Sequence, residues 1–236
     1  MPDIILRANT WAELKARLAE LDIEVPARSE GRKPCHVERY GIAHLLATLP
    51  AERLSFPLTL THRDKPDFLL AMPDGDDIGI EHTEAVPENV ARAQFLRGKG
   101  SGPDVYFILH VTPGEPRKTA AELKREIEAD APGGAWVGDS PEREWAVAIA
   151  HYVKEKLPKA TADGFVRYRT NWLIVYDNWP VPTVSYAKSA TYLTPLLMEM
   201  GAFSVFDVIF VHDDSHMCEF RDAPVSQTLW PLQTPK

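Results

Sequence analysis

The chain has 236 residues, of which 44% are hydrophobic and 25% charged, a composition typical of a folded globular protein. Its formal net charge of −8 excludes a protein that coats nucleic acid through bulk positive charge, although it leaves room for a local basic groove. Two cysteines cannot build a disulfide framework, and neither a signal peptide nor an apolar run of membrane-spanning length is visible. We therefore expect a cytoplasmic protein with no membrane partner.

Apolar periodicity divides the chain into expected helices and strands. A helix over residues 10–23 starts with Thr10 and Glu13 at capping positions, and a polar linker follows it. The later elements, in chain order, are a helix over 35–49, strands over 58–62, 67–72 and 78–83, a helix over 88–97, a buried strand over 105–111, helices over 118–129 and 140–157, a strand over 171–176, a helix over 190–200, and strands over 205–212 and 217–220.

Three consecutive strands, followed by alternating helices and strands, predict an α/β fold with a mixed central β-sheet flanked by helices. We expect residues 1–34 to form an N-terminal helix and linker. Residues 35–236 are expected to form one α/β domain.

The segment around Pro73-Asp74-Gly75 predicts a hairpin with a three-residue loop and glycine in the left-handed position. A loop centred there pairs Leu70 with Ile78 and sets Asp67 opposite Glu81. Opposed side chains in a sheet have Cβ atoms about 4.5–5.5 Å apart. The hairpin therefore places two carboxylates side by side on one face.

Two carboxylates at this spacing repel each other, and a divalent cation such as Mg²⁺ or Mn²⁺ removes the repulsion. Small residues at Gly79 and Thr83 leave space beside Glu81 for an ion and a substrate. The alternative is that Asp67 only starts a strand and Glu81 lies on a solvated face. A register slip of one residue also separates the two acids.

A third acid lies on the helix that precedes the hairpin. Glu38 extends the stripe formed by Ile42, Leu45 and Leu49, which should face the sheet. A carboxylate at the end of a buried stripe needs a partner, such as a metal-bound water or a substrate group. The alternatives are that Glu38 reaches solvent or pairs with an arginine.

Pro66-Asp67 and Glu81-His82-Thr83 resemble the two motifs of the PD-(D/E)XK nuclease superfamily, which has the restriction-endonuclease-like fold. The expected order of a helix carrying an acid, a three-strand meander, a helix and a strand is also similar to the family core, and it covers most of residues 35–176. The resemblance therefore implies a restriction-endonuclease-like core, with residues 177–236 as an extension.

The chain departs from the family pattern at Thr83, which occupies the position of the family's lysine. Some family members supply this lysine from the helix after the third core strand. Here Lys156 continues the stripe of Trp145, Ile149 and Val153 on that helix, so it is the favoured replacement. The second and third choices are Lys154 and Lys65.

The resemblance implies a nuclease that hydrolyses phosphodiester bonds with Mg²⁺ or Mn²⁺ as cofactor. In this reading Asp67, Glu81 and the backbone carbonyl of His82 hold the metal, Lys156 positions the attacking water, and Glu38 holds a second ion or its water shell. The expected partner is nucleic acid, DNA foremost, with a homodimer or a partner protein as further options. The alternative function is a catalytically inactive nuclease-fold protein that acts as a binding module.

Overall fold

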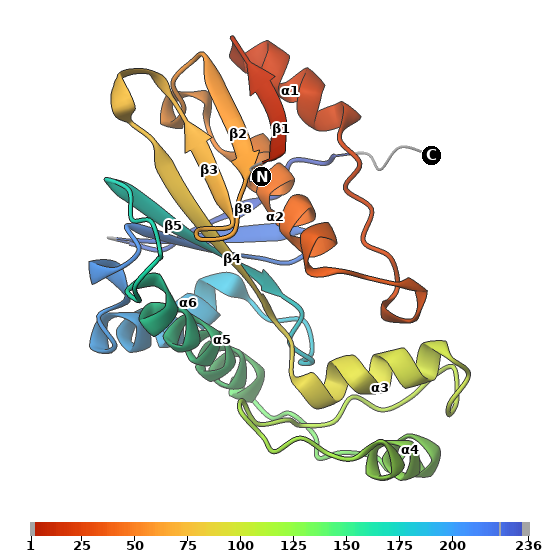
Figure 1. Ribbon diagram of the computed structural model, residues 1–236. Coiled ribbons are helices and arrows are strands. Elements are labelled where there is room, and N and C mark those ends of the chain that lie inside the picture. The colour runs from red at the N-terminus through yellow and green to blue at the C-terminus, as the bar shows by residue number, and fades with distance from the viewer. Residues whose placement is uncertain (1–2, 222, 233–236) are drawn as a thin grey trace.

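The computed structural model describes residues 3–221 and 223–232, which form a mixed α/β fold (Figure 1). Its eight described strands make one sheet in the order β1-β2-β3-β4-β5-β6-β7-β8. The strands are β1 (Asp3–Ala8), β2 (Leu58–His62), β3 (Phe68–Ala71), β4 (Ile78–Ala85), β5 (Thr170–Asp177), β6 (Val208–His212), β7 (His216–Phe220) and β8 (Val225–Thr228). The pairs β4–β5 and β5–β6 are parallel and the other five are antiparallel, which confirms the predicted mixed sheet.

The described residues contain six α-helices, which are α1 (Trp11–Glu20), α2 (Pro34–Thr48), α3 (Glu88–Gly98), α4 (Ala120–Ala129), α5 (Ser140–Ala160) and α6 (Tyr186–Glu199). Helices α1 and α2 pack on one face of the sheet, where Leu14, Leu45 and Phe68 share one apolar core. On the other face α5 and α6 form a second core that includes Trp145 and Leu193. The sheet is therefore buried on both faces along its parallel centre, as its apolar central strands require.

The predicted elements around the hairpin agree closely with the structure. Strand β2 has the predicted bounds, β3 and β4 differ from the prediction by one or two residues at their ends, and α2 begins one residue early with proline in its first turn. Two strands were not predicted. In β1 the alternation of side chains is interrupted by an irregularity between Ile4 and Leu6, and β8 has an almost entirely exposed burial pattern.

The prediction of a buried strand over residues 105–111 is wrong. The segment has no regular secondary structure, and the side chain of Val105 is 88% exposed. The Phe107 N–H donates to the carboxylate of Asp130 instead of to a neighbouring strand. Apolar, β-prone residues form a strand only where a partner backbone is available. This segment lies beside α3 and α4, past the end of β4 and away from the sheet (Figure 1).

Two helix boundaries also differ from the prediction. Helix α5 continues through Pro158 to Ala160 instead of ending near Leu157, so the proline lies in the last turn and does not end the helix. Helix α6 begins at Tyr186, where Ser185 caps it, and it contains Pro195.

The polar linker between α1 and α2, residues 21–33, is here called the arm. It includes a short 3₁₀ turn over Arg28–Glu30 and runs beside α3, where Ser29 packs against Gly98 (Figure 1). Among the described residues, no helix is both long and apolar enough to cross a membrane.

Candidate active site

The β3–β4 hairpin has the predicted register. Leu70 pairs with Ile78 and Phe68 with Ile80, and Gly75 has the left-handed φ of 76° that the loop requires. Continued by one residue, this register sets Asp67 opposite Glu81. The two acids lie on the α5 side of the sheet, since the intervening Phe68 and Ile80 belong to the core beneath α1 and α2.

Asp67 is held in place by the next strand. Its Oδ2 accepts a hydrogen bond of 2.7 Å from the backbone N–H of His82. The regular β3–β4 ladder ends at Phe68, so this side-chain bond continues the pairing beyond the last backbone pair. The aspartate is thereby fixed at the point where the two strands separate.

The proline of the Pro66-Asp67 pair has a physical consequence for His82. The same register, continued by two residues, places Pro66 opposite His82, and proline has no N–H to donate. Because the N–H and C=O of a strand residue point to the same side, the His82 carbonyl also points toward β3, where the ladder donor is missing. This carbonyl, predicted as a metal ligand, therefore lies on the same side of β4 as Asp67.

Glu81 is buried, with 7% of its surface exposed, and its two carboxylate oxygens have different surroundings. Oε1 accepts a hydrogen bond of 2.7 Å from Nζ of Lys156, whose side chain is 15% exposed. Oε2 is buried and has no hydrogen-bond partner. Of the three candidate lysines, Lys156 makes this contact, whereas Lys154 and Lys65 are exposed.

The pKa of Asp67 is raised to about 7, and burial is the largest cause of this rise. The charge of Glu81 contributes to the rise, while Lys156 and the His82 N–H act in the opposite direction. Glu38 also raises this pKa, so its charge is close enough to be felt at Asp67. Because these carboxylates repel one another, the group favours either a proton shared between the acids or a bound cation.

Glu38 lies on α2 as predicted, at the end of a stripe whose other members, Ile42, Leu45 and Leu49, are buried. Its carboxylate is 2.9 Å from Nε2 of His62, at the end of β2. Glu38 therefore pairs with a histidine, a partner that was not predicted, rather than with solvent or an arginine. Glu38 lies on the α2 side of the sheet, and its charge acts on Asp67.

The space expected beside Gly79 is filled. A Cβ at this position would lie 2.6 Å from Cδ2 of Tyr168 and 3.2 Å from Cγ of Pro66. Glycine is needed there because the tyrosine ring packs against the strand, so the expectation that Gly79 makes room for a substrate is wrong. The Tyr168 hydroxyl accepts a hydrogen bond from Arg63, which adds a cation and a phenol near the acids that sequence reasoning missed.

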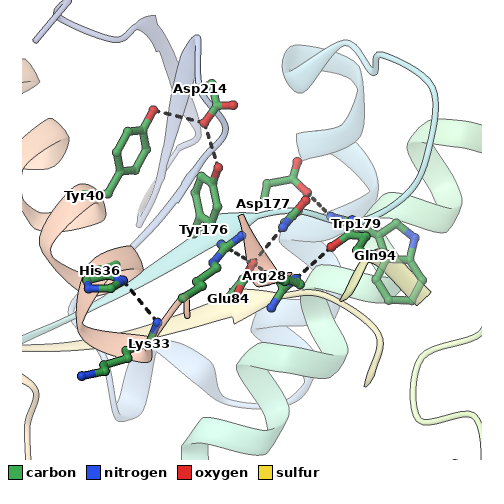
Figure 2. A network of polar contacts seen from close by, with 12 residues as sticks. Arg28, Lys33, His36, Tyr40, Glu84, Gln94, Tyr176, Asp177, Trp179 and Asp214 are labelled. Atoms are coloured by element: carbon green, nitrogen blue, oxygen red, sulfur yellow. Dashed lines mark hydrogen bonds and ion pairs between the residues drawn. The ribbon is translucent and has the colours of Figure 1, made fainter. Parts of the chain in front are cut away.

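Sequence reasoning also missed the basic residues of the arm. Arg28 and Arg32 both donate to Oε1 of Glu84, at 2.6 and 2.7 Å, and Asn178 donates to the same oxygen at 2.8 Å (Figure 2). A signal was present, because two arginines spaced by four residues occur in a segment otherwise read as a linker. Their carboxylate partner lies three residues after Glu81 on β4.

The residues of the acid pair fit a divalent cation. Carboxylate and carbonyl oxygens are the donors that Mg²⁺ and Mn²⁺ prefer, and the unpartnered Oε2 of Glu81 provides a free donor atom. No group of three or more His, Cys, Asp or Glu side chains in the described part of the chain is placed to hold a metal ion. A cation bound at this site would be held by Asp67, Glu81 and the carbonyl of His82, with the remaining positions left to water or substrate.

Comparison with family models, with curated proteins and with solved structures gave no match for this chain.

Proposed function

We propose that the protein is a Mg²⁺- or Mn²⁺-dependent nuclease that hydrolyses phosphodiester bonds, DNA foremost, on a restriction-endonuclease-like core. One observation carries the proposal. Glu81 shares a buried site with Asp67 and Lys156, and one oxygen of this glutamate has no partner. Burial of an unsatisfied carboxylate oxygen costs free energy, and a bound cation beside Glu81 would remove this cost.

In this proposal Asp67 and Glu81 bind the ion through their carboxylates, and the His82 carbonyl completes the protein's donor set. When bound, the ion supplies the positive charge that stabilises the phosphate as it is attacked and lowers the pKa of water. The His82 N–H keeps Asp67 oriented through its hydrogen bond to Oδ2.

In the same proposal Lys156 positions the attacking water and balances negative charge, and Glu38 orients the water shell of the ion. The Lys156 ammonium, held against Oε1 of Glu81, has further N–H donors for the attacking water or a phosphate oxygen. It thus supplies from α5 the cation that Thr83 does not supply from β4. Glu38, oriented by His62, is placed to accept hydrogen bonds from the water shell of an ion.

The test is cleavage of single- and double-stranded DNA and RNA by the purified protein with Mg²⁺ or Mn²⁺. We expect Asp67→Asn and Glu81→Gln each to lower cleavage by at least about a hundredfold, since each removes a charged ligand. Asp64→Asn is the matched control, because Asp64 is exposed and only three residues away. Calorimetry with Mn²⁺ should show binding to the wild type and to the control but not to the two site variants.

A second pair of variants tests the role of the lysine. Lys156→Met should abolish cleavage while leaving Mn²⁺ binding intact, and Lys154→Met, on the exposed side of the same helix, should change neither. Absence of cleavage by the wild type on all four substrates, with Mn²⁺ still bound, would favour the alternative of an inactive nuclease-fold binding protein. Absence of both cleavage and Mn²⁺ binding would refute the proposed site.

A further inference from the structure

Two cavities share a pair of arginines, and the first of them reaches Glu38 and His82 of the candidate active site. The first, of about 310 Å³, is lined by Glu38, His82 and Thr83 on the side of the acids and by Arg28 and Arg32 on the other. The second, of about 410 Å³, continues from the same two arginines to Arg92 and Phe95 of α3. Because both are lined by Arg28 and Arg32, the two cavities are neighbours, and together they are here called the arm groove.

The arm groove is basic in an acidic protein. Its lining includes four cations, Arg28, Arg32, Lys33 and Arg92, and two acids, Glu38 and Glu84, so its formal charge is 4 − 2 = +2. The formal net charge of the whole chain is −8. A local surplus of positive charge in such a chain attracts a polyanion to this groove rather than to the surface in general.

The two shared arginines are ordered and partly enclosed. Their side chains are 18% and 13% exposed for Arg28 and Arg32, and both are oriented by Glu84. Arg28 is also held by Gln94 of α3 at 2.8 Å (Figure 2). Nε of Arg32 is buried without a partner. One carboxylate does not neutralise two guanidinium groups, so the pair keeps charge and donors for an anion in the groove.

The far end of the groove offers an aromatic surface. Phe95 lines the second cavity and is 44% exposed, with Nζ of Lys99 at 5.9 Å from its ring centre. Arg92, one turn earlier on α3, donates to the carbonyl of Lys118, which fixes its position at the rim. Fixed cations followed by an exposed aromatic ring are the elements with which proteins bind single-stranded nucleic acid.

We propose that the arm groove binds one single strand of nucleic acid, with a phosphate on Arg28 and Arg32 and a base against Phe95, and leads this strand toward His82, the chain neighbour of Glu81. The identification of the strand as substrate rests on the proposed function. The first cavity is bounded by the arm, the start of α2 and the end of β4, and the second by the arm and α3. We expect a thin, flexible strand to reach the enclosed arginines, whereas a duplex meets only the rim of the cavities. The groove thus selects single-stranded segments.

The test separates binding from cleavage by using an Asp67→Asn/Glu81→Gln background in EDTA. Anisotropy of a labelled 12-nucleotide oligothymidine should show binding that is at least tenfold tighter than binding of a duplex of the same length. Addition of Phe95→Ala should weaken binding of the single strand about tenfold, the size expected for loss of one stacked base. Addition of Arg32→Gln should lower the slope of log K against log salt by roughly 0.7 for each phosphate that the variant no longer neutralises.

Arg17→Gln, at an exposed position of α1, is the matched control. It should leave both the affinity for the single strand and the salt dependence of binding unchanged. Phe95→Ala removes no ion pair and keeps the test valid if Arg32→Gln melts at a lower temperature. Equal affinity for the duplex, or binding unaffected by Phe95→Ala, would overturn the inference. So would equal binding of a polyphosphate without bases. Binding as described but without cleavage by the wild type in Mg²⁺ or Mn²⁺ would overturn the proposed function alone.

Discussion

Two acidic sites on neighbouring strands show what distinguishes a structural carboxylate from a candidate catalytic one. Burial raises the pKa of Asp177, at the end of β5, to about 6, and that of Asp67, beside β4, to about 7. Both oxygens of Asp177 are satisfied by protein donors: Nε1 of Trp145 at 2.6 Å, the Tyr186 hydroxyl at 3.1 Å and the backbone N–H of Trp179 at 3.2 Å.

The Asp67–Glu81 site lacks this completeness. Asp67 has one backbone donor, Glu81 has one lysine, and Oε2 of Glu81 has none. A raised pKa is therefore common to both sites and identifies neither as functional. The number of protein donors distinguishes the two sites. The Asp67–Glu81 site, here called the incomplete site, has a carboxylate oxygen without a protein donor that an added cation can bind.

The largest effect on stability is expected from breaking the ion pair of the incomplete site. Lys156→Met leaves the Glu81 carboxylate buried without its cation, and we expect a loss of roughly 3 to 5 kcal/mol in the free energy of unfolding. The measurement is urea unfolding at neutral pH. The double variant Lys156→Met/Glu81→Met should recover most of the loss, since both charges are removed together. A loss below about 1 kcal/mol would mean that the pair is solvated.

The next effect is the pH dependence of stability. The pKa of Asp67 is raised from 3.8 to about 7, so between about pH 4 and pH 7 the folded chain holds a proton that the unfolded chain has lost. The free energy of unfolding should therefore fall with rising pH in this window, by on the order of 4 kcal/mol, and become flat above pH 7. Asp67→Asn should abolish this component.

Asp177 also contributes to the pH dependence of the free energy of unfolding. The pKa of Asp177 is raised to about 6, so Asp177→Asn should remove a fall that is complete by about pH 6 and leave the fall near pH 7. Added Mn²⁺ should stabilise the wild type most above pH 7, where Asp67 is ionised, and should not stabilise Asp67→Asn. If wild type and Asp67→Asn showed the same dependence of stability on pH, the fall near pH 7, whose midpoint is the upper of the two, could not be assigned to Asp67.

The local part of this site could be predicted from the sequence. The turn residues around Gly75 and the alternation along two short strands fix the register that brings Asp67 opposite Glu81, and the helical stripe through Trp145 and Val153 carries Lys156 to the sheet. In each case neighbours along the chain determine the geometry, so a periodic pattern is sufficient to predict it.

The parts that could not be predicted depend on contacts between distant segments. Residues 105–111 have strand propensity but no strand to pair with, and Tyr168 occupies the space beside Gly79 from a loop nearly 90 positions away. From the sequence alone the arm is interpreted as a polar linker. Its arginines, Arg28 and Arg32, bind Glu84, which lies more than 50 positions later in the chain. A periodic sequence pattern does not predict such contacts between distant segments.

A smaller effect is expected at the complete site. Asp177→Ala leaves the N–H of Trp145 and the hydroxyl of Tyr186 without an acceptor, and we expect a loss of about 2 kcal/mol in the free energy of unfolding. Cleavage and Mn²⁺ binding, measured at a temperature where the variant is folded, should stay at the wild-type level. A specific loss of metal binding would show that Asp177 belongs to the active site and would remove the contrast between the two sites.

The smallest effect is expected at the third acid, where the partner is a half-exposed histidine. Glu38→Gln weakens the contact with His62, and the loss should be below about 1 kcal/mol, as for other partly exposed pairs. Its informative consequence is electrostatic. Glu38 raises the pKa of Asp67, so its neutralisation should move the upper midpoint of the stability curve to lower pH. Glu24→Gln, at an exposed position of the arm, should leave the midpoint unchanged. A midpoint that is equally unmoved by Glu38→Gln would mean that Glu38 and Asp67 do not share one electrostatic site, because a charge that acts on a neighbour must shift that neighbour's titration when it is removed.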